Sequence, residues 1–277
     1  MDFKLLKISK IIIIIIFYSF FRIKKKKKIG VIGLKHGNNI GNNLVKYAIS
    51  IILTELGFEP YIIGIKRKYC NISFINKTIN LRILKNNFSE ISINDYDILM
   101  VNSDQTWRKT DRHFYDHAFL KFAKNWNIPK FIYGASLGHD SWILTKEDEE
   151  IAKECLKNFT GISVREKRSI KLIKKHLGFN PKFVLDPTLL IDKKYYINII
   201  KDYKNDLNIN DNYIFTYLIS GKEKVVNFIK TASLKLGYKV NNVTMNSENY
   251  VEKFIYGIIH SNSVITDSFH GTIFSII

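Results

Sequence analysis

Short apolar runs alternate with amphipathic segments along most of the chain. An apolar run at 29–33 is followed by a segment at 44–56 whose apolar residues recur at helical spacing, and then by a second apolar run at 60–65. Short apolar runs are typical of buried strands, so these segments predict a strand–helix–strand unit with a right-handed crossover. Gly57 provides the expected end of the helix.

The alternation continues to about residue 190. Strands that alternate with helices predict an α/β fold built on a parallel sheet. The expected elements are strands at 97–101, 130–133, 161–164 and 183–185 and helices at 146–159 and 169–177.

The pattern restarts after a charged and polar stretch at 195–212. We therefore expect two Rossmann-like domains, at 29–195 and 212–277. The sequence stops soon after the last expected strand, so we expect the second domain to be incomplete, as in a fragment or a truncated gene product. Its expected elements are strands at 213–219, 239–243 and 261–266 and a helix at 222–236.

An apolar run with lysines on both sides opens the chain. Residues 11–21 read IIIIIIFYSFF, and residues 24–28 are all lysine. At about 1.5 Å per residue the run is shorter than the roughly 30 Å core of a bilayer, and it lacks the cleavage site of a secretory signal. We expect residues 1–28 to hold a cytoplasmic protein at the anionic inner face of the membrane, either lying in the interface or spanning it with snorkelling lysines. A buried first strand or helix is the alternative.

The net charge of +18 indicates anionic partners, although most of it is accounted for by solvated helix faces. RNA-binding and zinc-finger patterns are missing from the sequence, so we expect no nucleic acid partner. Cys70 and Cys155 lie far apart, without metal-ligand spacing, and are expected to be buried and reduced. We expect neither a metal nor a cofactor.

A loop rich in glycine and asparagine follows the first expected strand. Glycines let the backbone approach a ligand, and free amides at a helix start attract anions. Gly37, Asn39, Gly41 and Asn42 are therefore candidates for substrate binding. The loop lacks the spacing of a P-loop or a dinucleotide fingerprint, and a helix-capping turn is the alternative.

Polar residues also follow the strands at 97–101 and 130–133. Asp104 is a candidate base or ligand for sugar hydroxyls, and Trp107 is a candidate for stacking on a sugar face. Ser103, Gln105 and Ser136 are candidate substrate contacts in the same loops. An Asx turn beside a core tryptophan is the alternative for the first loop. Ligands of open α/β sheets bind beyond the carboxyl ends of the strands, where these residues fall.

Arg165 directly follows the expected strand at 161–164. A guanidinium there suits a carboxylate or a phosphate, which it can bind with two parallel hydrogen bonds. A structural ion pair with Glu166 is the alternative.

His270 lies between the last expected strand and a helix start. Histidine is suited to proton transfer near neutral pH. Ser268, Gly271 and Thr272 are candidates to hold phosphate oxygens beside it. A purely structural histidine is the alternative.

Taken together, these segments resemble the polysaccharide pyruvyl transferase family. The matching pieces occur in family order over residues 29–277. They are GNNIGNNLVKYAI at 37–49, YDILMVNSDQTW at 96–107, YGASLG at 133–138, ISVRE at 162–166, VLDPTLL at 184–190 and VITDSFHGTIFSI at 264–276.

The resemblance implies a fold similar to the two-domain, GT-B-like glycosyltransferases, with an active site in the interdomain cleft. It implies phosphoenolpyruvate as the anionic donor and a sugar or lipid-linked oligosaccharide of a cell-surface or exopolysaccharide as the acceptor, with a pyruvate ketal as the product. Arg165 and His270 match family positions and are expected to line one anionic cleft, where Arg165 binds the donor and His270 transfers a proton. Many members carry Arg-Leu-His-Gly where this chain has SFHG, so a donor-binding arginine is missing there.

Two other functions fit the pattern. A glycosyltransferase that uses a nucleotide-sugar belongs to the same broad class. A non-catalytic partner in the assembly of surface polysaccharide belongs to a different one, and an incomplete second domain favours it.

Overall fold

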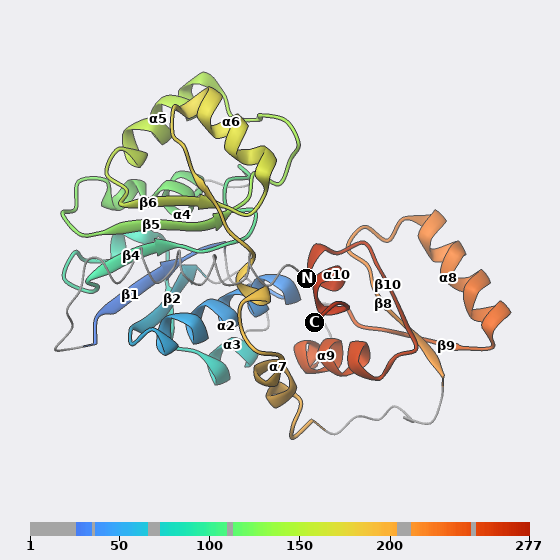
Figure 1. Ribbon diagram of the computed structural model, residues 1–277. Coiled ribbons are helices and arrows are strands. Elements are labelled where there is room, and N and C mark those ends of the chain that lie inside the picture. Colours follow the sequence, from blue (N-terminus) through green and yellow to red (C-terminus); the bar gives the residue numbers. More distant parts are fainter. Residues whose placement is uncertain (1–25, 35–36, 66–72, 110–112, 204–211, 245–247) are drawn as a thin grey trace. The chain divides into compact units, whose positions relative to one another are not determined.

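A computed structural model describes residues 26–34, 37–65, 73–109, 113–203, 212–244 and 248–277 (Figure 1). The described residues form two compact units. The first holds the described residues up to Gly37 together with those of 42–190, and the second holds 38–41 together with the described residues of 191–277. Residues 1–25, which carry most of the predicted membrane segment, and Cys70 lie outside the described residues. Within the described ranges, no helix is both long enough and apolar enough to cross a bilayer.

The first unit is built on a seven-stranded parallel sheet in the order β3-β2-β1-β4-β5-β6-β7. The order runs outward in both directions from β1 and β4, so the winding of the chain reverses between these two strands. Such a reversal is the point where open α/β sheets bind ligands. The strands are β1 (Lys28–Ile32), β2 (Glu59–Ile65), β3 (Leu81–Leu84), β4 (Ile98–Val101), β5 (Lys130–Ala135), β6 (Gly161–Val164) and β7 (Lys182–Phe183).

The central strands are buried on both faces. All residues of β4 and β5 are buried, and only Lys28 of β1 is exposed. This explains why the sequence shows continuous apolar runs there instead of alternation. The edge strand β3 is half-exposed, and its weak pattern left it out of the sequence prediction.

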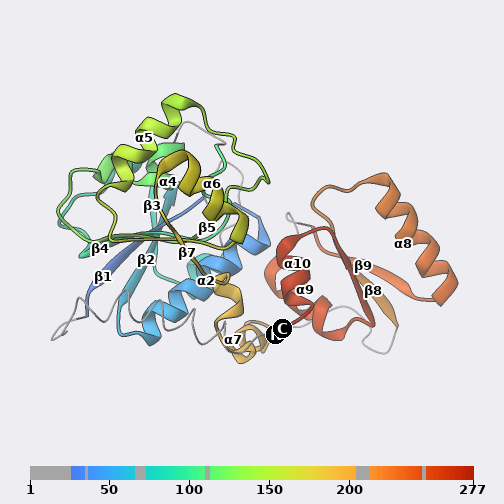
Figure 2. The same cartoon turned by 45° about the horizontal axis from the view of Figure 1, so that its top comes forward.

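Helices cover both faces of this sheet. Figures 1 and 2 show α5 and α6 on one face and α2 on the other. Thr145 and Asp148 form a capping box at the start of α5, and Gly178 ends α6 in the left-handed conformation, as its position in the sequence predicts. The helices are α2 (Ile40–Glu55), α3 (Ser73–Thr78), α4 (Phe114–Phe119), α5 (Lys146–Leu156) and α6 (Lys167–Leu177), with 3₁₀ turns at Phe88–Glu90, Lys121–Ala123 and Pro187–Leu189.

The second unit contains a three-stranded parallel sheet in the order β10-β8-β9. Figure 2 shows α8 on one side of this sheet and α9 and α10 on the other. The strands are β8 (Tyr213–Tyr217), β9 (Lys239–Asn242) and β10 (Ser263–Thr266), and the helices are α7 (Lys193–Ile199), α8 (Glu223–Leu236), α9 (Tyr250–His260) and α10 (Phe269–Phe274).

Two helices of the second unit differ from the sequence prediction. Helix α7 occupies the start of the stretch that we predicted as a connection, and α9 was not predicted. Gly257 weakens the helical pattern of α9, because glycine is a poor helix former. The packing explains this glycine: a Cβ there would lie 2.2 Å from the ring of Phe215.

Candidate functional site

Asp104 is held in an unusual backbone conformation at the carboxyl end of β4. Its φ of 118° lies in a region that residues other than glycine rarely adopt. Its carbonyl oxygen accepts hydrogen bonds from the amides of Ser136 and Thr106, at 2.9 and 2.7 Å. Its carboxylate accepts a third, from the amide of Gln105 at 2.8 Å. Strain that the surroundings fix in this way is concentrated at functional sites.

The side chain of Asp104 contacts the first turn of α2, the helix that follows β1. The amide nitrogen Nδ2 of Asn42 donates to Oδ2 of Asp104 at 3.0 Å, and both side chains are buried. Asn42 lies in the first turn of α2. This hydrogen bond therefore joins the two strand ends at which the winding of the sheet reverses.

A glycine at the end of β5 makes room for Ser103. Gly134 has a φ of 61°, and the pairing of β5 with β6 shifts register beyond Ile132. The hydroxyl of Ser103 donates to the Gly134 carbonyl at 2.9 Å, and a Cβ on Gly134 would lie 3.0 Å from that hydroxyl oxygen. Ser163 fixes the shifted strand, because its hydroxyl accepts from the Gly134 amide and donates to the Ile132 carbonyl, both at 3.0 Å.

Arg165 lies at the end of β6 with its guanidinium among three carboxylates. It donates to Asp186 at 2.6 Å, to Glu166 at 3.2 Å and to Asp104 at 3.3 Å. Burial lowers the pKa of this guanidinium, but the three carboxylates outweigh burial, so the pKa is raised above its ordinary value. The pair with Glu166, the alternative considered for this residue, is present, and the guanidinium also bonds to Asp186 and Asp104. Donor binding by Arg165 stays a prediction.

Asp186 is a central residue of this network that sequence reasoning did not select. Its Oδ2 accepts from Arg165 at 2.6 Å and, at 3.2 Å, shares the single hydroxyl proton of Ser103 with the Gly134 carbonyl. Its Oδ1 accepts from the amide and the hydroxyl of Thr188, at 3.1 and 2.7 Å. The signal was available, since Asp186 follows an expected strand within the VLDPTLL motif, as Asp104 and Arg165 follow theirs.

Gln105, Ser136 and Gly37, which the sequence also predicted for the site, form hydrogen bonds with residues nearby in the sequence. Gln105 accepts from the exposed Arg108 at 3.2 Å, and the hydroxyl of Ser136 accepts from the amide of Gly138 at 3.0 Å. Gly37 accepts from Asn43 at 3.0 Å.

Trp107 is a core residue and not a surface for stacking. Its side chain is fully buried, and its ring packs on Phe119 with centroids 5.1 Å apart. A sugar cannot reach the ring in this conformation, so the structure replaces the predicted stacking role with the alternative, a core tryptophan beside a polar turn. The polar loop gave no signal of burial, because the apolar partners come from α4.

Residues 39 and 41 flank the start of α2. Asn39 is exposed immediately before the helix, and Gly41 is buried in its first turn.

His270 is buried in the first turn of α10. Ser268 caps this helix, since its hydroxyl accepts from the amide of Gly271 at 3.3 Å. The hydroxyl of Thr272 donates back to the Ser268 carbonyl at 3.2 Å. Arg165 belongs to the first unit and His270 to the second, so their common cleft stays a prediction.

Asp267, directly after β10, accepts hydrogen bonds from the loop after β8. Its carboxylate accepts from the amides of Ile219 and Ser220, at 2.6 and 3.0 Å, and from the Ser220 hydroxyl. Burial raises the pKa of Asp267, but these hydrogen bonds outweigh burial and lower the pKa below its ordinary value. The sequence prediction did not select this residue.

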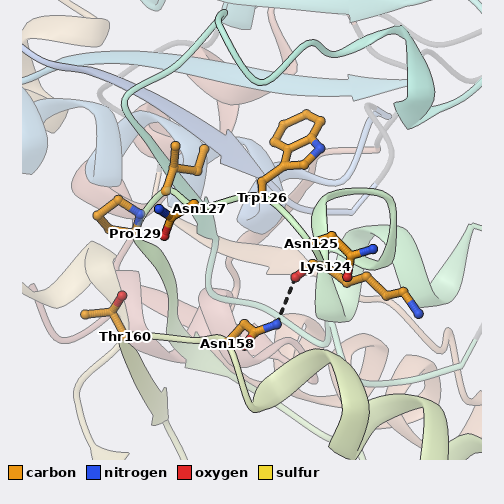
Figure 3. Close-up of a pocket in the computed structure, with 8 residues that line it drawn as sticks. Lys124, Asn125, Trp126, Asn127, Pro129, Asn158 and Thr160 are labelled. Atoms are coloured by element: carbon orange, nitrogen blue, oxygen red, sulfur yellow. Dashed lines mark hydrogen bonds between the residues drawn. The ribbon is translucent and has the colours of Figure 1, made fainter.

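Two cavities lie away from the predicted site residues. One, of about 380 Å³, is lined by residues that precede β5 and β6, including Lys124, Trp126 and Thr160 (Figure 3). It opens at the amino edge of the sheet, and Asn158 donates to the Lys124 carbonyl there at 3.0 Å. The other, of about 540 Å³, lies in the second unit among α7, α9 and α10 and is mainly aliphatic. Neither is lined by a predicted site residue.

The acidic residues around Arg165 do not form a metal site. Over the part of the chain that the structure describes, no group of three or more His, Cys, Asp or Glu side chains is arranged to hold an ion. The carboxylates of the network are bound instead to a guanidinium, amides and hydroxyls.

Solved structures share this fold. A candidate UDP-N-acetylglucosamine 2-epimerase from Listeria monocytogenes superposes with a TM-score of 0.55 at 12% identity, covering 90% of this chain and 76% of that one. MnaA of S. aureus in complex with UDP superposes with a TM-score of 0.50 at 16% identity, covering 88% and 74%. At such identities the likeness shows the fold alone, which is α/β and GT-B-like. The comparison with curated proteins gives no significant match.

The family follows from a second comparison. The family model described as polysaccharide pyruvyl transferase matches residues 39–277, which is most of the chain. The chain therefore belongs to the polysaccharide pyruvyl transferase family and is a transferase, as the ordered motifs indicated.

Proposed function

We propose that this protein transfers a pyruvyl group from phosphoenolpyruvate to a sugar of a cell-surface or exopolysaccharide. The observation that supports this most directly is Asp104, a strained and partly accessible carboxylate at the point where the winding of the sheet reverses. Family membership supplies the reaction class.

The chemistry requires a proton donor and a proton acceptor. Protonation of the methylene carbon of phosphoenolpyruvate makes its C2 electrophilic. One sugar hydroxyl adds to C2 and loses its proton to a base. A second hydroxyl then displaces phosphate, which leaves with the proton of that hydroxyl, and the ketal closes. In this proposal Asp104 accepts the hydroxyl proton and His270 donates to the methylene carbon.

The proposal also covers the residues that bind the donor and the place of the enzyme at the membrane. Ser268, Gly271 and Thr272 are proposed to contact the donor. A lipid-linked acceptor would place the enzyme at the inner membrane face, in agreement with the lysines of residues 1–28.

The test is a transfer assay with the full chain. Lipid-linked sugars are incubated with phosphoenolpyruvate, and release of phosphate and gain of a ketal are followed by mass spectrometry. Asp104→Asn is expected to abolish most transfer. Asp95→Asn is the matched control, because Asp95 also pairs with an arginine, Arg82 at 2.7 Å, but precedes β4 at the opposite edge of the sheet.

Two results would contradict the proposal. Transfer from nucleotide-sugars and not from phosphoenolpyruvate would identify the chain as a glycosyltransferase. Transfer from neither, by a folded full-length protein, would favour the non-catalytic assembly partner.

A further inference from the structure

The cavity at the amino edge of the first sheet is lined mainly by uncharged polar side chains (Figure 3). These are the amides of Asn125, Asn127 and Asn158 and the hydroxyl of Thr160. The side chains of Asn125, Asn127 and Thr160 form no hydrogen bond with any residue that the structure describes. The volume of about 380 Å³ falls within the range of small-molecule sites, about 300–1,000 Å³. The cavity therefore has both the room and the free polar groups to bind a ligand.

A buried lysine fixes the loop that forms one wall of this cavity. Lys130, the first residue of β5, is 1% exposed, and its ammonium donates to the carbonyls of Trp126 and Ala123 at 2.6 and 3.3 Å. Burial lowers the pKa of this ammonium. Because a buried cation is costly without partners, the two carbonyls are held in place by it, and the course of the loop is fixed.

The second wall is joined to the first. The side-chain amide of Asn158 donates to the Lys124 carbonyl at 3.0 Å, and the backbone amide of Thr160 donates to the Lys130 carbonyl at 2.8 Å (Figure 3). The segments before β5 and before β6 are thus linked without a ligand. A preformed site has less conformational freedom to lose on binding, which favours affinity.

The charge of the lining favours a neutral ligand. Of the described residues that line the cavity, Lys124 alone is charged, and its ammonium pairs with the carboxylate of Glu154 at 2.6 Å. In a chain with a net charge of +18, this cavity offers an anion no unpaired cation. Amides and hydroxyls both donate and accept, as sugar hydroxyls do. The half-buried indole of Trp126 adds the apolar surface that the carbon-bound face of a sugar needs.

We propose that this cavity is a second saccharide site, which binds a neutral sugar away from the reacting one. Asp104 pairs with Ala135, five residues after Lys130 along β5, so the two sites are roughly 17 Å apart at about 3.3 Å per residue. A remote sugar of a polymeric acceptor would occupy the cavity. That role rests on the proposed function, whereas binding of the sugar is measured without it.

The experiment follows occupancy of this cavity directly. Glucose, galactose, N-acetylglucosamine and lactose are titrated into the full chain without donor, and the NMR signals of the Asn125 and Asn127 side-chain amides are recorded. Asn127→Trp fills the mouth of the cavity from an exposed position, and it is expected to weaken binding at the Asn125 signal by about tenfold or more. Thr160→Val keeps the shape but removes one hydroxyl, and a loss of about three- to tenfold is expected.

Asn94→Trp is the matched control. Asn94 is also an exposed asparagine at the amino edge of the sheet, shortly before β4, but it does not line the cavity. This variant is expected to bind the sugars as wild type does. In transfer, Asn127→Trp is expected to raise KM for a polymeric acceptor and to leave KM for a single repeating unit and for the donor unchanged.

Three outcomes overturn the inference. The first is wild-type protein in which none of these sugars moves the Asn125 and Asn127 signals. The second is a larger response of these signals to phosphoenolpyruvate than to the sugars, which would make the cavity an anion site. The third is equal weakening of binding in Asn94→Trp and Asn127→Trp, or unchanged binding in Thr160→Val. If the sugars bind as expected and no pyruvyl transfer occurs, the proposed function fails while the saccharide site stands.

Discussion

In both units an aspartate just beyond a strand accepts hydrogen bonds from neighbouring segments. The two aspartates differ in burial and in the groups that donate to them. Asp186 is buried and accepts from a guanidinium as well as from hydroxyls and an amide. Asp267 is exposed, and its carboxylate accepts hydrogen bonds from two backbone amides and a hydroxyl. A buried carboxylate needs a counter-charge, whereas an exposed one is also stabilised by water. The first unit is therefore the more sensitive of the two to loss of a single charge.

Removal of the Asp186 carboxylate tests this difference most strongly. Asp186→Ala removes the acceptor of one Arg165 nitrogen and of the Thr188 amide and hydroxyl, while Asp104 and Glu166 still pair with Arg165. It is expected to lower the free energy of unfolding by about 2–4 kcal/mol. Asp267→Ala is expected to lower it by less than about 1 kcal/mol, because the group is exposed. Urea unfolding measures both, and equal losses would contradict the comparison.

Asp104→Asn separates chemistry from stability within the same network. The amide keeps the shape of the side chain but cannot accept a proton, so turnover is expected to fall by about 10²–10⁴-fold. Steady-state kinetics on the folded variant measures this loss. A variant with nearly full turnover would exclude Asp104 as the base.

Gly257→Ala tests the packing of the second unit. A Cβ at this position would lie 2.2 Å from the Phe215 ring, so the ring has to move, and a loss of about 1–3 kcal/mol is expected from overpacking. The control is Gly33→Ala directly after β1, where a Cβ would make an ordinary contact, 3.5 Å from the Cβ of Asn102, and the backbone φ is not positive. Thermal unfolding that follows each unit separately would distinguish the two effects. An equal or smaller loss in Gly257→Ala would contradict the packing argument.

Acid titration gives the smallest effect. The pKa of Asp267 is lowered in the folded state, so its contribution to stability is present above its unfolded value of about 3.9 and is lost as pH falls through the folded pKa. Wild type and Asp267→Asn are therefore expected to differ in stability at pH 7 and to converge once the pH has fallen below the folded pKa of Asp267. A difference that persists in acid would show that the carboxylate charge is not its source.

The sequence predicted which polar residues follow the strands better than it predicted which side chains they contact. Asp104 and Arg165 were selected because each follows an apolar strand, and this local signal is strong. Asp186 gives the same signal, but its importance comes from Arg165, 21 residues earlier, and from Ser103, 83 residues earlier. Trp107 lay in a polar loop, yet packing against α4 removed it from any ligand. Long-range pairing of this kind is set by topology, which local patterns do not reveal.

The spacing of the network along the chain has a consequence for the order of folding. Asp104 contacts Asn42, 62 residues earlier, and Arg165, 61 residues later. A nascent chain that has paired β1, β2, β4 and β5 would carry the left-handed turn at Asp104 without the guanidinium that stabilises it. We expect this turn to become rigid only after β6 and β7 have joined the sheet, so that protection of the Gln105 amide against hydrogen exchange would mark the last cooperative step in assembly of the first unit.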